Sequence, residues 1–391
     1  MAMKNGKIYM DNAATTRVDE RVIGAMAPYF SERFGNASSL HEYGRGASVA
    51  VEVAREKVAK LLGAKAEEIY FTSGGTEADN LALKGAAFAA RGRGKGNHII
   101  TSAIEHPAVL QACEFLGKDG FEVTYVPVDR EGAVKADAIG DAITKNTSLV
   151  SVMHANNEIG TIQPVSEIGK ICGERGVLFH SDAVQTFGKI ETDVKKMNAD
   201  LVSLSAHKIY GPKGVGALYV RDGVELSTLM HGGGHERGLR AGTENVPGIA
   251  GFGKAAEICG KGMVKEAKRV SGMRDALIDG VLSEIKDVAL NGHRKQRLPG
   301  NANFSFSHIE GEALIMMLDD KGVAASTGSA CSSKSLKASH VLLALGMREV
   351  QAHGSLRLTL GRFNTRQDVD YVLGVLPGVV KGLRKISPLG K

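Results

Sequence analysis

Short apolar runs alternate along much of the chain with longer segments whose polar and apolar positions indicate helices. The runs that predict strands lie at residues 68–71, 98–102, 148–153, 176–181 and 200–204. Alternation of strands and helices is typical of a largely parallel sheet covered by helices. We therefore expect the segment from about Thr15 to about Gly260 to form a large α/β domain.

The pattern changes after about residue 260. A helix-like stretch over 264–285 is followed by a strand-like run at 303–306, a helix over 311–318 and a strand over 356–360. This mixture predicts a smaller α+β domain. A chain of 391 residues is long enough to bury two cores, so we expect two domains.

Composition narrows the classes of partner. The formal net charge of +6 is modest for 391 residues, and the basic patch at 91–95 is interpreted as a solvated loop, so nucleic acid is not expected. No apolar run is long enough to cross a membrane, and the first ten residues lack the apolar core of a signal peptide. We expect a cytoplasmic protein without a membrane partner, in a compartment that keeps thiols reduced.

Polar side chains follow several predicted strands. Lys208 comes shortly after the run at 200–204, and Asp182 follows the run at 176–181, with Gln185 three residues later. Ligands of open α/β sheets bind at the carboxyl ends of the strands. An amine and an acid fit pyridoxal phosphate, which needs a lysine for a Schiff base and an acid to keep its ring nitrogen protonated. Taken alone, a lysine in such a Gly/Pro loop is far more often a surface lysine than a catalytic one.

A third strand end carries small residues that suit a phosphate. Gly75 and Thr76 precede a helix-like segment, where free N–H groups and the positive end of the helix dipole bind anions. The same residues often serve only as a helix cap. Nucleotide binding is the poorer interpretation, because Glu77 would repel a polyphosphate and the Walker pattern is absent.

Two further strand ends add candidate side chains. His106 follows the run at 98–102 and can stack on a cofactor or move protons near neutral pH, although a single histidine is more often structural. Asn157 follows the run at 148–153 and offers an amide to the cofactor or the substrate. Polar residues therefore recur at the edge of the sheet where ligands bind.

One of the four cysteines lies in an unusual setting. Cys331 is surrounded by serine, glycine and alanine between residues 324 and 335, where nothing would bury the thiol, so a functional role is as probable as an inert one. Cys113, Cys172 and Cys259 fall in helix-like apolar segments and are expected in the core. No pair has the C-x-x-C spacing of the usual zinc and dithiol sites.

An arginine near the end of the chain is a candidate for binding a carboxylate. Arg357 alternates with apolar residues along a predicted strand, and a guanidinium has the fork geometry that an amino-acid substrate needs. An arginine on a strand is more often a solvated charge, and Arg362 is a competing candidate.

Taken together, these motifs resemble the class V aminotransferase group of fold-type I pyridoxal phosphate enzymes, and within it the cysteine desulfurases of the NifS/IscS type. The resemblance covers essentially the whole chain. The segments that carry it are 9–16, 35–39 with His41, 74–77, 105–106, 156–160, 181–185, 205–208, 232–243 and 328–331.

The resemblance implies a fold and a set of residue roles. The fold is a large domain over 15–260 with a mostly parallel seven-stranded sheet, and a small α+β domain made of 1–14 and 261–391 that carries the catalytic cysteine. Lys208, Cys331 and His106 are implied as catalytic, and Arg357, Asn157 and Asn36 as substrate-binding. The implied cofactor-binding residues are Gly75, Thr76, His106, Asn157, Asp182, Gln185, Ser205, His207, Lys208 and, from the neighbouring subunit of a homodimer, Thr243.

The implied activity is removal of sulfur from L-cysteine, which gives L-alanine and a persulfide on Cys331. The family passes this sulfur to a scaffold protein for iron–sulfur cluster assembly, and the loop at 326–331 resembles the group with the longer loop. Two alternatives stay open, another reaction of the same fold that does not need Cys331 and a docking protein without turnover. We expect no metal site, while transient contact of Cys331 with a cluster stays open.

Overall fold

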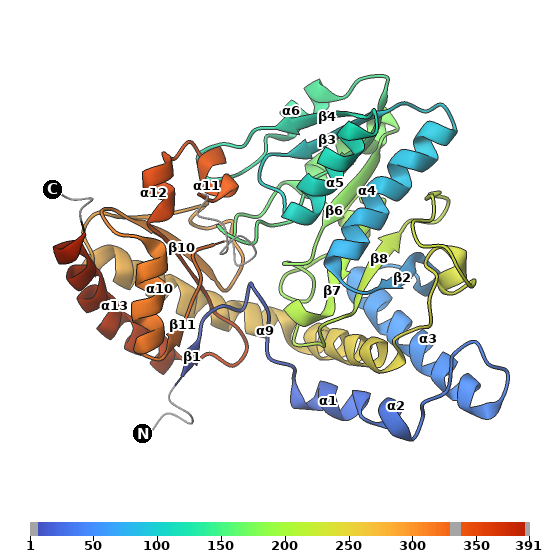
Figure 1. Ribbon diagram of the computed structural model, residues 1–391, viewed down its shortest axis with the longest axis horizontal. Coiled ribbons are helices and arrows are strands. Elements are labelled where there is room, and N and C mark those ends of the chain that lie inside the picture. Colours follow the sequence, from blue (N-terminus) through green and yellow to red (C-terminus); the bar gives the residue numbers. More distant parts are fainter. Residues whose placement is uncertain (1–6, 329–337, 388–391) are drawn as a thin grey trace.

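A seven-stranded sheet forms the centre of the computed structural model, which describes residues 7–328 and 338–387 (Figure 1). β8 is antiparallel to both of its neighbours, and the other strands are parallel. The mostly parallel seven-stranded sheet that the sequence predicted is thereby confirmed. Its strands are, in spatial order, β2 (Ile69–Thr72), β8 (Gly216–Val220), β7 (Leu201–Ser205), β6 (Leu178–Asp182), β5 (Thr147–Ser151), β3 (His98–Ser102) and β4 (Glu122–Val126).

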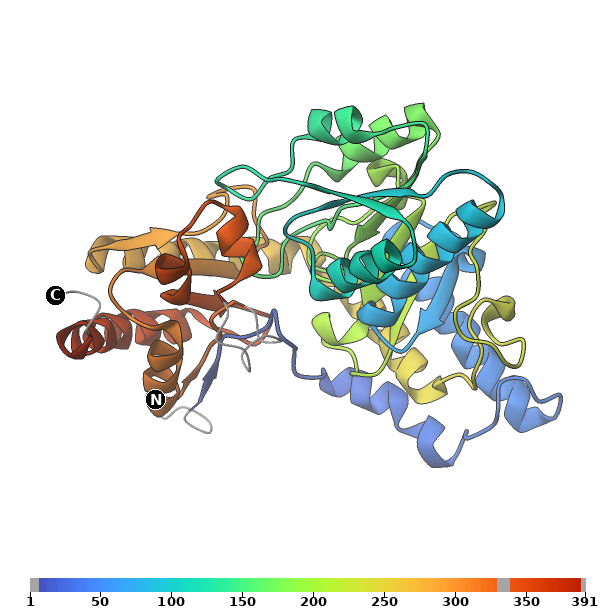
Figure 2. The same ribbon diagram turned by 45° about the horizontal axis from the view of Figure 1, so that its top comes forward.

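Neighbouring residues of the central strands belong to cores on opposite faces of this sheet. Ile99 joins one core and Ile100 the other, and Leu149 and Val150 divide in the same way. Successive side chains of a strand point to opposite faces, so strands covered on both sides are apolar throughout. Helices lie on both sides of the sheet (Figure 2). α4 (Gly75–Gly92) and α5 (Pro107–Lys118) share one core, while α3 (Glu42–Leu62), α7 (Val165–Arg175) and α8 (Val194–Met197) belong to the other.

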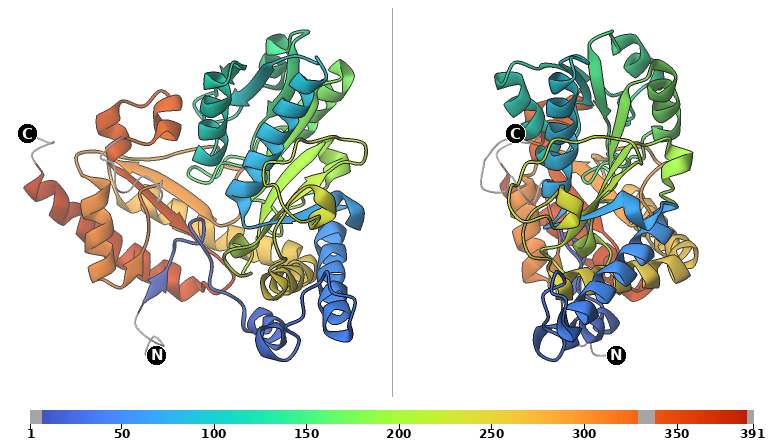
Figure 3. Two further views of the ribbon diagram at one scale, coloured as in Figure 1. Left: turned by 45° about the vertical axis from the view of Figure 1, so that its right-hand side comes forward. Right: turned by 90° about the vertical axis from the view of Figure 1, so that its right-hand side faces the viewer.

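The longest helix, α9 (Val246–Glu284), packs in two cores and extends from the large sheet to the C-terminal elements (Figure 3). Its first half contacts α3 so closely that a Cβ atom on Gly253 would lie 2.5 Å from Ala54 Cα. The sequence predicted a helix over 264–285. These residues are helical up to Glu284, but the helix begins earlier than predicted, at Val246. Gly260 and Gly262 lower helix propensity, but packing at both ends keeps the segment helical.

A second group of elements surrounds another core. β10 (Asn301–Phe306) pairs antiparallel with β12 (Ser355–Thr359) and β9 (Val288–Leu290), and β1 (Ile8–Tyr9) pairs with β11 (Val323–Ala324). The N-terminal strand therefore packs with C-terminal elements, while the domain boundaries near residues 14 and 260 stay predictions. The other helices are α1 (Glu20–Met26), α2 (Pro28–Ser31), α6 (Ala136–Ala142), α10 (Gly311–Asp320), α11 (His340–Ala344), α12 (Glu349–His353) and α13 (Arg366–Ile386). In the described parts of the chain, no helix has the length and apolar character that a membrane crossing requires.

Candidate active site

A pocket of about 250 Å³ lies at the carboxyl ends of the parallel strands. It brings together residues that follow β2, β3, β5, β6 and β7 with others from the N-terminal segment and from β12. The predicted site residues that line it are Gly75, Thr76, His106, Asn157, Asp182, Gln185, Ser205, His207, Lys208 and Arg357.

Lys208 ends a short 3₁₀ turn that begins directly after β7. Its Nζ donates to the carbonyl oxygens of Ala13 and Ala14, at 2.5 and 2.7 Å. The amine is therefore held at the pocket wall by the segment that follows β1. These carbonyls were not among the predicted site atoms, since an alanine gives no side-chain signal in the sequence.

Asp182 ends β6 and is buried in the pocket wall. Its Oδ1 accepts the N–H of Val184 at 2.8 Å. Burial raises the pKa of Asp182 to about 6, while the Val184 N–H and the charge of Lys208 act to lower it. A buried carboxylate needs a cationic or hydrogen-bonding partner, which the protonated ring nitrogen of pyridoxal phosphate would supply.

Two further buried acids lie near Asp182. Asp79, on α4, lines the pocket, and its Oδ1 has no hydrogen-bond partner. Burial and the charge of Asp182 raise the pKa of Asp79 well above its usual range. Burial also raises the pKa of Glu105 to about 8, although Ser102 Oγ and the Met153 N–H donate to it. Like charges cannot all ionise in one low-dielectric region, so Asp79 and Glu105 hold their protons and Asp182 is the acid best placed to ionise.

The part of the pocket that the sequence predicted to hold a phosphate is built on the start of α4. Gly75 begins this helix, and a Cβ atom there would lie 2.7 Å from Val184 Cγ2, so the backbone approaches the neighbouring loop closely. Glu77 points to another partner: its carboxylate pairs with Arg240 at 2.8 Å. The repulsion that the sequence suggested for Glu77 is thus largely neutralised, and the N–H groups at the helix start suit an anion.

Both predicted histidines are neutral at ordinary pH. His106 caps α5, and its Nδ1 accepts the N–H of Ala108 at 3.1 Å, so the proton of the neutral ring belongs on Nε2. Burial, the charge of Lys208 and His340 lower the pKa of His106 to about 4. Burial and nearby lysines, Lys208 first, lower the pKa of His207 to about 3, and its Nδ1 lies 3.0 Å from Thr15 Oγ1.

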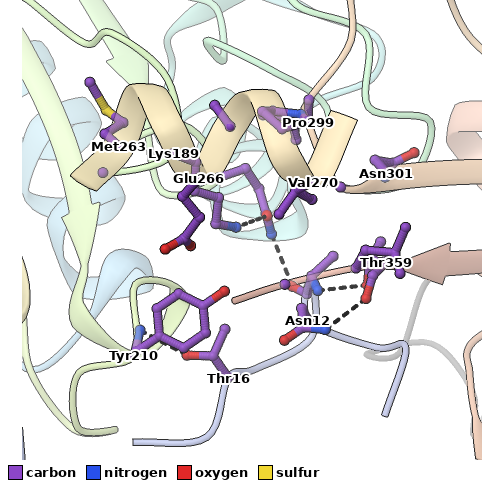
Figure 4. Close-up of a pocket in the computed structure, with 18 residues that line it drawn as sticks. Asn12, Thr16, Lys189, Tyr210, Met263, Glu266, Val270, Pro299, Asn301 and Thr359 are labelled. Atoms are coloured by element: carbon purple, nitrogen blue, oxygen red, sulfur yellow. Dashed lines mark hydrogen bonds between the residues drawn. The ribbon is translucent and has the colours of Figure 1, made fainter. Parts of the chain in front are cut away.

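Gln185 lines both this pocket and a smaller cavity of about 50 Å³. Figure 4 shows the smaller cavity, with Lys189 among its lining residues. Gln185 Nε2 donates to the Ala13 carbonyl at 3.0 Å, and its Oε1 accepts from Lys189 Nζ at 3.2 Å. Burial lowers the pKa of Lys189 to about 7. Because the Ala13 carbonyl can only accept, its contact fixes which end of the Gln185 amide carries the N–H groups.

Arg357 on β12 is the arginine that faces the pocket. One terminal nitrogen donates to the carbonyls of Asn157 and Gly328, the other pairs with Asp11 at 2.8 Å, and the buried Nε has no partner. Arg362, the competing candidate, lies elsewhere and pairs with Glu266 and Asp19. The register of β12 therefore decides between the two arginines, which sequence spacing left open.

Two of the predicted residues that the structure describes do not line this pocket. Thr243 and Asn36 are exposed and do not line it in the single chain, and Cys331 lies outside the described residues. The other cysteines are buried, as the sequence predicted. Burial raises the pKa of Cys113 and Cys172 to about 12. Sequence reasoning missed Asp79 and Glu158 as pocket residues, although Glu158 lies inside the 156–160 motif and Asp79 lies two residues after the 74–77 motif.

A model of the family described as Aminotransferase class-V matches residues 8–372 of the chain. The chain is 54% identical over 387 residues to the cysteine desulfurase IscS of Clostridium botulinum, a match that covers 98% of this chain and 97% of that protein. It is also 54% identical over 389 residues to the cysteine desulfurase IscS of Methanosarcina thermophila, covering 100% of this chain and 96% of that protein.

Solved structures show the same likeness. A NifS-like protein superposes with a TM-score of 0.90 at 42% identity, covering 96% of this chain and 100% of that one. An apo structure of a cysteine desulfurase from Thermococcus onnurineus NA1 gives a TM-score of 0.86 at 27% identity, covering 97% of this chain and 96% of that one. The likeness therefore extends over both groups of elements.

Proposed function

This chain belongs to the class V aminotransferase family, and from that premise we propose that it is a cysteine desulfurase, which removes sulfur from L-cysteine and leaves L-alanine. The observation that carries the proposal is the convergence of Lys208, Asp182 and Arg357 on one pocket. An amine, a buried acid and a guanidinium are the groups that an amino-acid reaction of this family needs.

The family and its fold imply dependence on pyridoxal phosphate. When bound, the cofactor supplies an electron sink for negative charge at the substrate Cα. We propose that Lys208 holds it covalently, Asp182 pairs with its ring nitrogen, the Gln185 amide donates to its phenolic oxygen and His106 covers its face. The residues proposed for its phosphate are Gly75, Thr76, Ser205 and His207, with Thr243 from a neighbouring subunit.

The side chains of the pocket suggest how L-cysteine is handled. Arg357 binds its carboxylate, with Asn157 and Asn36 as the other proposed substrate contacts, and the amine of Lys208 takes the proton from Cα. The neutral His106 does not repel the Lys208 ammonium that results. The thiolate of Cys331 then attacks the substrate sulfur, so that the Cβ–S bond breaks and a persulfide forms on the enzyme.

We propose three further features of the protein in the cell. The chain works as a homodimer, because Thr243 is exposed in the single chain and does not line its own pocket, so the Thr243 proposed to reach the cofactor phosphate would come from a second subunit. A scaffold protein for iron–sulfur clusters accepts the sulfur, in keeping with the IscS name of the relatives. A cytoplasmic location would keep the nucleophilic thiol reduced.

The deciding experiment is to incubate the purified holoenzyme with L-cysteine and a reducing thiol, and to measure alanine and sulfide together. Equal amounts of both products are expected, and Cys331→Ala should abolish them. Pyruvate and ammonia beside the sulfide would indicate β-elimination instead. Unchanged turnover in Cys331→Ala would contradict the persulfide route and favour another reaction of the same fold.

A further inference from the structure

Glu158 contacts both described ends of the segment that carries Cys331. Its Oε2 accepts a hydrogen bond from Ser339 Oγ at 2.5 Å, just after the segment. Just before the segment, Gly328 lies so close that a Cβ atom there would be 2.9 Å from the same oxygen. Gly328 also has a φ of 123°, which favours glycine. The described chain ends thus meet at one carboxylate.

Glu158 is itself held firmly in the pocket wall. The side chain is buried, its N–H donates to Asn156 Oδ1 at 2.8 Å, and its carbonyl accepts from the amides of Asn301 and Asn303, at 3.0 and 3.1 Å. Asn303 lies on β10 opposite Arg357. Glu158 therefore has a fixed position relative to the arginine proposed to bind substrate.

Other contacts hold the same two chain ends. Before the segment, Arg357 donates to the Gly328 carbonyl at 2.6 Å, and Ser355 Oγ donates to the Thr327 carbonyl at 2.7 Å. After it, His340 Nε2 lies 2.9 Å from the Glu105 carbonyl oxygen. Glu158 differs from these contacts because its one oxygen adjoins both ends.

Glu158 is poorly suited to bind the substrate itself. Its carboxylate lines the same pocket as Arg357, where it would repel the carboxylate of an amino acid. It also lacks the ion pair with Arg357 that Asp11 makes. A role toward the chain ends is therefore better supported than a role toward substrate or cofactor.

We propose that Glu158 is a positioning residue for sulfur transfer, whose carboxylate fixes Gly328 and Ser339, the described residues on either side of the segment that carries Cys331. This inference rests on the proposed function, because it assigns Cys331 the attack on the substrate sulfur. A charge-assisted hydrogen bond is stronger and shorter than a neutral one, so the Ser339 contact holds its chain end well. Loss of that contact would slow the attack of the Cys331 thiol on the substrate sulfur.

The test separates the two halves of the reaction in full-length holoenzyme. Exchange of the L-alanine Cα proton for deuterium, followed by NMR, needs Lys208 but no thiol. Persulfide formation on Cys331 in a single turnover with L-cysteine, followed by mass spectrometry, needs both. Glu158→Gln and Ser339→Ala are compared with the native protein and with Ser283→Ala, an exposed serine on α9 that donates only to the nearby Gly280 carbonyl.

We expect Ser339→Ala to keep proton exchange within twofold of the native rate. Both variants should slow persulfide formation, by at least tenfold in Glu158→Gln. Ser339→Thr, which retains a hydroxyl, should restore the rate lost in Ser339→Ala. Equal loss of both activities, or loss of neither, would overturn the proposal. If Glu158→Gln fails to fold, Ser339→Ala and Ser339→Thr decide alone. Absence of persulfide from the native enzyme would instead refute the proposed function.

Discussion

Removing the carboxylate of Glu236 is expected to destabilise the protein strongly. Glu236 and Arg55 form a buried ion pair, with Arg55 Nη1 2.7 Å from Oε2 and Nη2 3.1 Å from Oε1. Only 5% of the Arg55 side chain and 3% of the Glu236 side chain are exposed. Glu236 Oε2 also accepts the N–H of Phe71 at 2.8 Å, and Arg55 Nη1 donates to the Ile69 carbonyl. The pair thus ties α3 and β2 to the segment before Thr243.

The expected magnitude follows from this burial. Glu236→Ala leaves the buried Arg55 guanidinium with only the exposed Glu52 as a counter-charge, and breaking a buried pair by removing one partner costs about 3–5 kcal/mol. Arg55→Met leaves the Glu236 carboxylate buried without the guanidinium that pairs with it. The double variant leaves chiefly the Phe71 N–H unpaired, a loss of about 1–3 kcal/mol. The double variant should therefore lose less stability than the two single variants together.

Urea unfolding of the cofactor-free protein, followed by circular dichroism, measures the three variants. The control is Arg17→Ala, which breaks an exposed pair with Glu20 and should change the free energy of unfolding by less than about 1 kcal/mol. Single-variant losses below about 1 kcal/mol, or strict additivity in the double variant, would refute the reasoning. Loss of cofactor affinity without loss of stability would indicate that the ion pair positions the segment before Thr243 and does not stabilise the fold.

Three other outcomes are expected. Glu105, with its pKa raised from 4.5 to about 8, keeps a proton in the folded protein that the unfolded chain loses, so its contribution to stability falls as pH rises across that window; Glu105→Gln should flatten this fall in urea unfolding at pH 5 and pH 8. Gly253→Ala should lower stability by about 1–3 kcal/mol through the clash with Ala54, whereas Gly272→Ala, which meets open space, should raise it by about 0.5–1 kcal/mol, both read from thermal unfolding. Treatment of the native protein with iodoacetamide should add one carbamidomethyl group, as read by mass spectrometry, because Cys113, Cys172 and Cys259 are buried. The Cys331→Ala variant should gain no group. Two or more groups on the native protein would contradict this expectation.

Local signals in the sequence determined five of the seven strands of the large sheet, all but β4 and β8, and much of the pocket. Apolar runs fixed the central strands, and in parallel strands the residues that follow the carboxyl ends meet at one edge. Lys208 and Asp182 therefore line one pocket, although they are far from adjacent in the sequence. Their roles, like those of the other predicted site residues, stay proposals.

Tertiary structure alone decided which of several similar residues face that pocket. Arg357 and Arg362 are five residues apart, and only the pairing of β12 with β10 directs the first to the pocket and the second to Glu266. Asp79 becomes a buried acid near Asp182 because α4 packs against the sheet.

The continuity of α9 through two glycines also depended on packing, which outweighs a propensity difference of about 1 kcal/mol per glycine. Glu158 gives no local signal for its contacts with Gly328 and Ser339, since they join segments distant in the sequence. The sequence by itself determined which elements form and what chemistry lies at their ends, because those depend on neighbouring residues. Contacts between distant segments depend on the packed whole, and only the tertiary structure decided them.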